Sequence, residues 1–141
     1  MPSLPFQTFM LLSRAHAAAS RRFDAHLGSI HGLGLNDLVV LHHLYEAPDL
    51  RLRRIDLAEK LCLTPSGVTW LLRPLEKRRL VTREPSPADA RVAFAALTPA
   101  GERAVKDALA TAEGFAADLL GPRLGKREVT QAVQLLQQLA V

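Results

Sequence analysis

The chain has 141 residues, of which 48% are hydrophobic and 23% are charged, and it carries 18 Lys and Arg against 14 Asp and Glu. A chain of this length and composition suits one compact domain, which excludes the disordered and fibrous classes of protein. The single cysteine, Cys62, excludes an internal disulfide framework and fits a reducing compartment.

The first residues resemble a secretory signal only in composition. The apolar run Phe9–Leu12 is followed by the basic residues Arg14, Arg21 and Arg22, whereas a signal peptide places its positive charges before the apolar run. No stretch approaches the roughly 18 apolar residues of a membrane span. We therefore expect a cytoplasmic protein that does not enter a membrane.

A long helix is expected over residues 5–30, because apolar residues recur there three and four positions apart. The stripe comprises Phe9, Leu12, Ala19, Phe23, Leu27 and Ile30, with His16 in its gap. After the turn Gly32-Leu33-Gly34, Asn36 is the expected N-cap of a second helix, from Asp37 to about Glu46. Its inward-facing residues are expected to be Leu38, Leu41, Leu44 and Tyr45, and Pro48 ends it.

The next segment predicts a strand and two short helices. Residues 50–52 alternate as an edge strand, and a helix follows from Arg54 to Leu61 that is expected to bury Ile55, Leu57, Ala58 and Leu61. After a turn at Cys62 and Leu63, Thr64 is the expected N-cap of a fourth helix, which reaches about Arg78. Pro65 takes the first helical position, where a missing N–H costs nothing.

A hairpin and two further helices complete the chain. Residues 80–83 and 92–97 are strand-like, and residues 85–90 between them have turn chemistry. Thr98 and Pro99 open a long helix to about Leu120, with Val105, Leu109, Ala112, Ala116 and Leu119 on one side. Gly121 and Pro122 break it, and a last helix over residues 126–140 carries Val129, Val133, Leu136 and Leu139 at helical spacing.

Positive charge gathers in the middle of the chain. Residues 51–91 hold ten Lys and Arg against five acids, while the other 100 residues hold eight against nine. This basic segment coincides with the order strand, helix, turn, helix, hairpin, which is that of a winged helix-turn-helix. The sequence therefore predicts a mainly α fold with a small antiparallel β wing (α+β) that binds double-stranded DNA.

The terminal helices carry more apolar surface than a DNA-binding core of about 60 residues needs. Their simplest partner is a second copy of the chain, although they could also pack on their own domain. A two-fold homodimer would match a pseudo-palindromic operator. We thus divide a single domain, residues 1–141, into a winged helix-turn-helix over residues 36–98 and dimerisation helices over residues 1–31 and 99–141.

Six short motifs in order give the chain a family resemblance. They are Asp56-Leu-Ala-Glu-Lys-Leu, Thr64-Pro-Ser-Gly-Val-Thr, Leu75-Glu-Lys-Arg, Leu80-Val, Asp89-Ala-Arg and Leu97-Thr-Pro-Ala-Gly. With this pattern the chain resembles the MarR (multiple antibiotic resistance regulator) family of bacterial transcription factors. The resemblance implies transcription regulation by a homodimer, here expected to be a repressor released by a small phenolic or anionic molecule.

The resemblance also implies which residues meet DNA. The fourth helix looks like the recognition helix, so Ser66, Thr69, Trp70 and Arg73 are expected to face the major groove, beside Thr64 at its start. Asp89 and Arg91 match the family's wing-tip pair, in which the arginine enters the minor groove and the acid braces it. Candidates for phosphate contacts are Arg54, Lys77, Arg78 and Arg83.

Three residues depart from the family pattern. Trp70 stands where a basic or polar residue is common, so it either makes apolar contacts with thymine methyls and sugars or packs between the third and fourth helices. Pro74 removes a helical N–H and predicts a bend. Arg79 replaces the usual glycine at the helix exit, so either a left-handed turn is strained or the exit differs.

Family members bind small molecules between the dimer helices and the DNA-binding part. The resemblance therefore implies a pocket there, and the histidines are the polar residues best placed to line it. His16, His42 and His43 could line such a pocket, with Phe23 and Tyr45 as its walls, or serve as ordinary core and surface histidines. Metal-ligand spacing is missing, so we expect neither a metal nor a cofactor.

Two other functions stay open at this stage. One is a winged-helix module that binds proteins without sequence-specific DNA binding, and the other is a thiol redox sensor acting through Cys62. An enzyme is not expected, because the chain lacks a Gly-rich phosphate loop, a nucleophile elbow and a paired catalytic carboxylate motif.

Overall fold

The fold is described by a computed structural model that covers residues 1–140. Its elements are mostly helical, and the predicted class, mainly α with a small antiparallel sheet, is confirmed. In chain order they are α1 (Leu4–His31), α2 (Leu35–Glu46), the 3-10 helix η1 (Pro48–Leu50), β1 (Arg51–Arg53), α3 (Arg54–Leu61), α4 (Pro65–Lys77), β2 (Val81–Pro85), β3 (Ala93–Leu97), α5 (Pro99–Leu120) and α6 (Lys126–Leu139).

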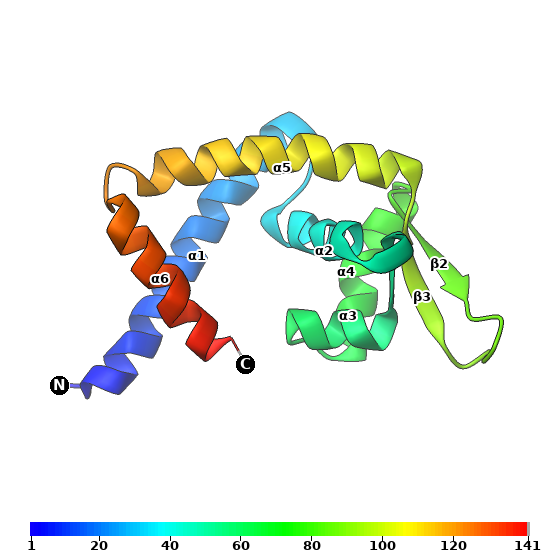
Figure 1. Cartoon of the computed structure of the whole chain (residues 1–141), viewed down its shortest axis with the longest axis horizontal. Coiled ribbons are helices and arrows are strands. Elements are labelled where there is room, and N and C mark those ends of the chain that lie inside the picture. Colours follow the sequence, from blue (N-terminus) through cyan, green and yellow to red (C-terminus); the bar gives the residue numbers. More distant parts are fainter. Residues whose placement is uncertain (141) are drawn as a thin grey trace.

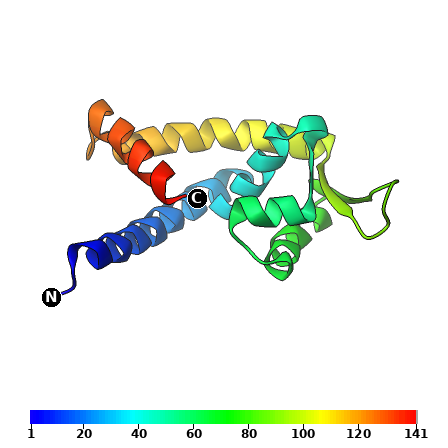
Figure 2. The ribbon, with the colours of Figure 1, turned by 60° about the horizontal axis from the view of Figure 1, so that its bottom comes forward.

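The molecule is elongated, with the β2–β3 wing at one end and the terminal helices at the other (Figure 1). The helix α5 runs along most of its length, the β2–β3 hairpin lies at one end, and α6 and the N-terminal half of α1 lie at the other (Figure 1). Turned forward, the hairpin projects beyond the helices as a free wing (Figure 2). Within residues 1–140, we find no helix with the length and apolar character needed to span a bilayer.

Two helices begin at the predicted threonine caps. The Thr64 hydroxyl accepts a hydrogen bond from the N–H of Gly67 at 3.1 Å, and the Thr98 hydroxyl accepts one from Gly101 at 3.0 Å. In both helices proline takes the next position. Each threonine satisfies a donor that the first helical turn would leave without a partner, so local chemistry fixes both helix starts.

The start of α2 differs from the prediction that Asn36 caps it. The helix begins at Leu35 with Gly34 as N-cap, and Asn36 lies inside the first turn. The Asp37 carboxylate accepts from the Gly34 N–H at 2.8 Å, and the Asp24 carboxylate of α1 accepts from the Leu35 N–H at 2.7 Å. Because two carboxylates bind these donors, the helix needs no capping side chain from Asn36.

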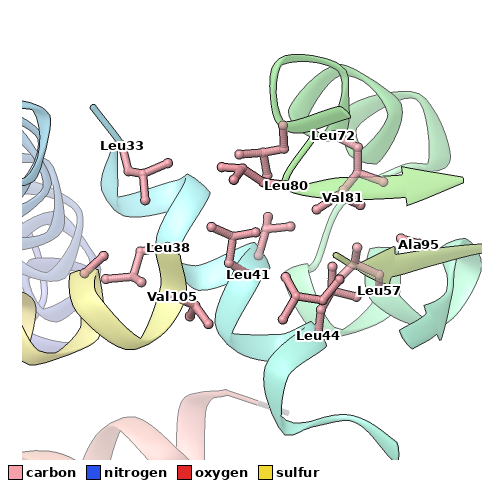
Figure 3. Packing of buried hydrophobic residues seen from close by; sticks show 14 of the residues in the cluster. Leu33, Leu38, Leu41, Leu44, Leu57, Leu72, Leu80, Val81, Ala95 and Val105 are labelled. Carbon is pink, nitrogen blue, oxygen red and sulfur yellow. The ribbon is translucent and has the colours of Figure 1, made fainter. Parts of the chain in front are cut away.

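The core is built around α2. Figure 3 shows Leu38, Leu41 and Leu44 of this helix lying between α5 on one side and the helix-turn-helix and sheet on the other. All three are at most 4% exposed, as predicted. Tyr45, predicted to face inward with them, is only half-buried. Burial of this helix joins the helix-turn-helix and the sheet to α5 in a single apolar core.

The sheet has three antiparallel strands in the order β1–β3–β2, so β1 is an edge strand as predicted. It begins one residue later than expected, at Arg51. One core prediction is wrong: Ile55 of α3 is 64% exposed, whereas Leu57 and Ala58 are buried. Two positions correspond to about 200° around a helix, so Ile55 and Leu57 point to opposite faces.

Both helices of the helix-turn-helix end in a left-handed residue that is not glycine. These residues are Cys62 after α3, with φ 54°, and Arg79 after α4, with φ 60°. At the exit of α4 the N–H of Leu80 binds the carbonyl of Leu75, and the N–H of Arg79 binds that of Glu76, both at 3.0 Å. This is the ordinary left-handed helix exit, so Arg79 keeps the turn and bears its strain.

The terminal helices leave most of their apolar residues uncovered. In α1 only Leu27 is buried, and α6 has no buried residue in the protomer. The exposed apolar side chains of these helices are Leu4, Phe6, Phe9, Met10, Leu11, Ile30, Val133, Leu135, Leu136 and Leu139. Within the described protomer, the two helices therefore do not bury this surface on their own domain.

A buried glycine at the start of α5 gives a test of the core. A Cβ added to Gly101 would lie 2.1 Å from the carbonyl oxygen of Leu80, which is backbone and cannot rotate away. We expect Gly101→Ala to lower the free energy of unfolding by about 2–3 kcal/mol, measured by urea denaturation. Gly114→Ala in the same helix is the control, since a Cβ there meets nothing within 4 Å. Equal stability of the two variants would show that α5 does not press on the Leu80 carbonyl.

Candidate nucleic-acid interface

The outer face of α4 brings together the four residues predicted to face the major groove. Ser66, Thr69, Trp70 and Arg73 are all exposed, and with Pro65 they line one shallow hollow. Positions 66, 69, 70 and 73 repeat at helical spacing, which puts these side chains on one face. Trp70 is 71% exposed, so the alternative that it packs between α3 and α4 is wrong.

Pro74 does not interrupt α4. The helix runs as one element from Pro65 to Lys77, with Pro74 inside it. The ring removes the N–H that would bind the carbonyl of Trp70, and the next turn is closed by the N–H of Arg78 on the Pro74 carbonyl at 3.0 Å. The face that carries Trp70 and Arg73 is therefore continuous.

The tip of the wing holds an arginine braced by an acid. The Asp89 carboxylate accepts from the Arg91 backbone N–H at 2.9 Å and from its guanidinium at 3.2 and 3.3 Å. These bonds, the backbone one first, lower the pKa of Asp89, so the acid stays charged through neutral pH. The Arg91 side chain is 91% exposed and is held at the tip of the hairpin.

A basic hollow connects the wing with the start of α3. Four arginines line it: Arg53, Arg54, Arg83 and Arg91. Arg54 also donates a hydrogen bond to Thr69 on the outer face of α4, at 3.4 Å. The surface from α4 to the wing tip is therefore contiguous, and four of its cations meet in one depression.

Two predicted phosphate ligands are bonded inside the protomer. The Arg54 guanidinium pairs with Glu76 at 2.9 Å, and its side chain is only 14% exposed. The Arg78 guanidinium donates to the carbonyl of Gly32 at the end of α1, at 2.7 Å. Arg54 thus ties α3 to α4, and Arg78 ties α4 to α1. The structure gives both residues an architectural role that spacing in the sequence does not reveal.

The other predicted cations are free to reach a ligand. Arg73, Lys77 and Arg83 are exposed and form no ion pair within residues 1–140. Arg53 and Arg91 of the same surface are also exposed, although each is paired with a nearby aspartate. Such a surface suits a polyanion, because exposed lysines and arginines can neutralise phosphates.

The histidines predicted to share a pocket are divided between two hollows. His16 and His43 line the larger one, of about 520 Å³, between α1, α2, α3 and α4. His42 and Phe23 line a more apolar one, of about 290 Å³, between α1, α2 and α5. Tyr45 lines neither. Leu35 and Val39 of α2 belong to both, so this helix is the wall between the two hollows.

The larger hollow also contains residues that the sequence analysis did not select. Lys60 of α3 and Trp70 of α4 line it beside His16 and His43. Burial, then the charge of Lys60, then that of His42 lower the pKa of His43, and Glu46 opposes them. His43 is therefore uncharged at neutral pH, and Lys60 is the fixed positive charge of the hollow.

Two further observations concern metal ligands and the single cysteine. Residues 1–140 hold no cluster of three or more His, Cys, Asp or Glu placed to bind a metal ion. Cys62 is exposed at the turn between α3 and α4. With no second cysteine in the sequence, a sulfenic acid formed there would have no intramolecular thiol with which to form a disulfide.

Comparison with known proteins agrees with this geometry. The sequence model of the MarR family matches residues 33–93. The HTH-type transcriptional regulator MhqR of Bacillus subtilis strain 168 is 33% identical over 101 residues, which are 72% of this chain and 68% of that protein.

Two solved structures cover nearly the whole chain. Sco3205, a MarR family transcriptional regulator from Streptomyces coelicolor solved in complex with DNA, has a TM-score of 0.85 and 24% identity, over 99% of this chain and 89% of its own. CouR from Rhodococcus jostii RHA1, solved bound to p-coumaroyl-CoA, has a TM-score of 0.83 and 25% identity, over 99% and 96%. The fold is thus shared from the first helix to the last.

The role of Arg54 can be tested against that of an exposed pair. We expect Arg54→Ala and Glu76→Ala each to lower the free energy of unfolding, with a coupling energy of roughly 1 kcal/mol in a double-mutant cycle, because the arginine is mostly buried. The control is the exposed pair of Glu102 and Lys106 on α5, where a coupling of about 0.3–0.5 kcal/mol is expected. If the effects of Arg54→Ala and Glu76→Ala are additive, the two side chains do not stabilise each other, and Arg54 is available for phosphate contacts.

Proposed function

The chain belongs to the MarR family of transcriptional regulators, and from this premise we propose that it is a homodimeric repressor that binds a pseudo-palindromic operator. We propose further that a small aromatic or anionic molecule releases it from DNA. Family members are regulators and not enzymes, which agrees with the absence of catalytic motifs in the sequence. A cytoplasmic location is part of the proposal, because the operator would be there.

One observation carries the proposed DNA binding: the outer face of α4 and the wing tip belong to a single exposed basic surface. Thr69 on α4 is bonded to Arg54, and Arg54 lines the same hollow as Arg83 and Arg91 of the wing. A recognition helix presents its first turns to base edges in the major groove, and an arginine on a thin hairpin suits the adjacent minor groove. The exposed outer face of α4 and the exposed Arg91 at the wing tip support this proposal.

We assign different tasks to the parts of this surface. Ser66, Thr69 and Arg73 would meet base edges, and Trp70 would offer apolar surface to thymine methyls or sugars. Lys77 and Arg83 would contact phosphates, which add affinity without sequence information. Thr64 would also lie beside the DNA, although its hydroxyl already accepts the capping hydrogen bond of α4.

The proposed dimer rests on the exposed apolar residues of α1 and α6. Nothing within the described protomer covers Phe9, Met10, Val133 or Leu136, although each is about half or more than half exposed, at 47% or above. A second copy would bury them, and a two-fold axis would bring two recognition helices to successive turns of the duplex. The domain division, with residues 36–98 for DNA and 1–31 and 99–141 for dimerisation, belongs to this proposal.

The proposed effector site is the larger hollow. It lies between the dimerisation helix α1 and the two helices of the helix-turn-helix, so a molecule there would contact both parts. CouR, solved with an aromatic acyl-CoA ester, is a structural relative with a ligand of this general kind. A volume of about 520 Å³ lies within the usual range for small-molecule sites.

The DNA-binding proposal is tested by fluorescence anisotropy of a labelled duplex taken from upstream of the chain's own coding region. We expect a preference of about 10³-fold or more over a shuffled duplex, with affinity falling steeply as salt rises, because phosphate contacts release counterions. Arg91→Ala should weaken operator binding by about 1–3 kcal/mol while the protein remains a dimer.

A charge-matched control distinguishes the effect of the wing arginine from a nonspecific effect of net charge on DNA binding. Arg123→Ala removes a cation of the turn before α6, far from the wing in sequence, and should leave operator affinity unchanged. Weak and equal binding to the operator and the shuffled duplex would point instead to a protein-interaction module. Unchanged affinity of Arg91→Ala would remove the wing tip from the mechanism.

The dimer is tested by analytical ultracentrifugation. We expect a mass of twice the protomer's 15.4 kDa, and Phe9→Asp combined with Leu136→Asp should raise the dimer dissociation constant by about 30-fold or more. The matched control is Ile55→Asp, which places the same charge at an exposed apolar residue of α3 and should leave the dimer intact. A wild-type chain that sediments as a monomer at tens of micromolar would refute the proposed dimer.

A further inference from the structure

We propose that Trp70 is a wall shared by the effector pocket and the DNA-facing surface, so that an aromatic carboxylate and the operator compete for one indole side chain. This inference rests on the proposed function and adds to it the residue through which release occurs. Its structural basis is that Trp70 lines two separate hollows.

The position of Trp70 on α4 explains the double exposure. Toward the pocket, α4 presents Gly67, Trp70 and Leu71, and toward the DNA it presents Ser66, Thr69, Trp70 and Arg73. Of all the described residues that line these two hollows, Trp70 is the one they have in common. It lies on the ridge between two faces of the helix, and a side chain as large as an indole reaches over both.

The chemistry of the pocket selects a flat molecule with a negative group. Its walls include Leu35, Val39, Leu61 and Leu71, and its charged lining residue is Lys60. No carboxylate lines the pocket. The neutral imidazole of His43 can donate a hydrogen bond from its N–H to a carboxylate oxygen. An aromatic carboxylate would thus bind its acid to Lys60 and place its ring against the apolar wall that ends at Trp70.

Exposure makes Trp70 available to either partner. At 71% exposed, the indole has most of its surface available for contact with either molecule. A ring stacked on the pocket side removes apolar surface that DNA would otherwise contact. A ligand can shift DNA affinity only through a difference in its own affinity for the free and DNA-bound states, and competition for one side chain supplies that difference.

The experiment measures the coupling between the two ligands in the full-length dimer. Operator affinity is measured with a red-labelled duplex, without acid and with saturating 2-naphthoate, and 2-naphthoate binding is measured separately by calorimetry. We expect the acid to weaken wild-type operator binding by about tenfold or more, within the usual range of coupling. The neutral 2-naphthamide should bind more weakly and have less effect, because it lacks the charge for Lys60.

Three variants locate the coupling. In Trp70→Ala we expect the ratio of operator affinities with and without saturating acid to fall to within about twofold of one, although the variant still binds both partners. Leu63 lines only the pocket, so Leu63→Ala should weaken binding of 2-naphthoate and leave the ratio of operator affinities at saturation unchanged. Arg73 lines only the DNA-facing hollow, so Arg73→Ala should weaken operator binding and also leave this ratio unchanged.

Acrylamide quenching gives a second reading, because Trp70 is the only tryptophan in the sequence. Operator DNA should protect its emission from the quencher, whereas the shuffled duplex should protect it less. Protection by neither duplex would contradict the contact with DNA.

The outcomes separate this inference from the proposed function. If Trp70→Ala keeps the wild-type coupling ratio, the shared wall is wrong, while operator binding by the wild type still supports the regulator. If the wild type binds the operator but ignores 2-naphthoate, the assigned ligand class is wrong. If the wild type binds no operator with preference, the proposed function fails, and the shared wall fails with it.

Discussion

Burial of α2 is the constraint on which the other parts depend. Of its twelve residues only Asn36, Val39 and Glu46 are exposed, and its leucines contact the sheet and helix-turn-helix on one side and α5 on the other. An apolar helix buried from several sides cannot shift without opening the core, so it fixes the DNA-binding part relative to α5. The same packing makes α2 the wall between the two hollows, through Leu35 and Val39.

Arginine has two separate duties in this fold. Arg54 and Arg78 connect α4 to α3 and to the end of α1, and both connections are short hydrogen bonds. Arg73, Arg83 and Arg91 point away from the core and are exposed. The first pair helps to hold α4 against α3 and the end of α1, and the second group is available to a ligand.

Local chemistry accounts for the predictions that were confirmed. Thr64-Pro65 and Thr98-Pro99 place two helix starts correctly, because a threonine hydroxyl and a proline act within one turn of the chain. At Arg79 the sequence left two alternatives open, and the structure has the strained left-handed turn, since any non-glycine in that position bears the strain. The contact between Asp89 and Arg91, which the family resemblance implied, also spans only two residues.

Contacts between distant residues account for the predictions that were wrong or incomplete. Asn36 was the expected cap of α2, but Asp24, eleven residues from Leu35, supplies one carboxylate there. Nothing in the sequence pairs Arg54 with Glu76, or divides His16 and His42 between two hollows. By itself, the sequence determined the family, the order of the elements and the charged face of the DNA-binding part, because periodicity, caps and motifs act over short distances. Only the tertiary structure decided which arginines are free, which residues line the pocket and that Trp70 borders both surfaces, because these depend on how separate helices pack around α2.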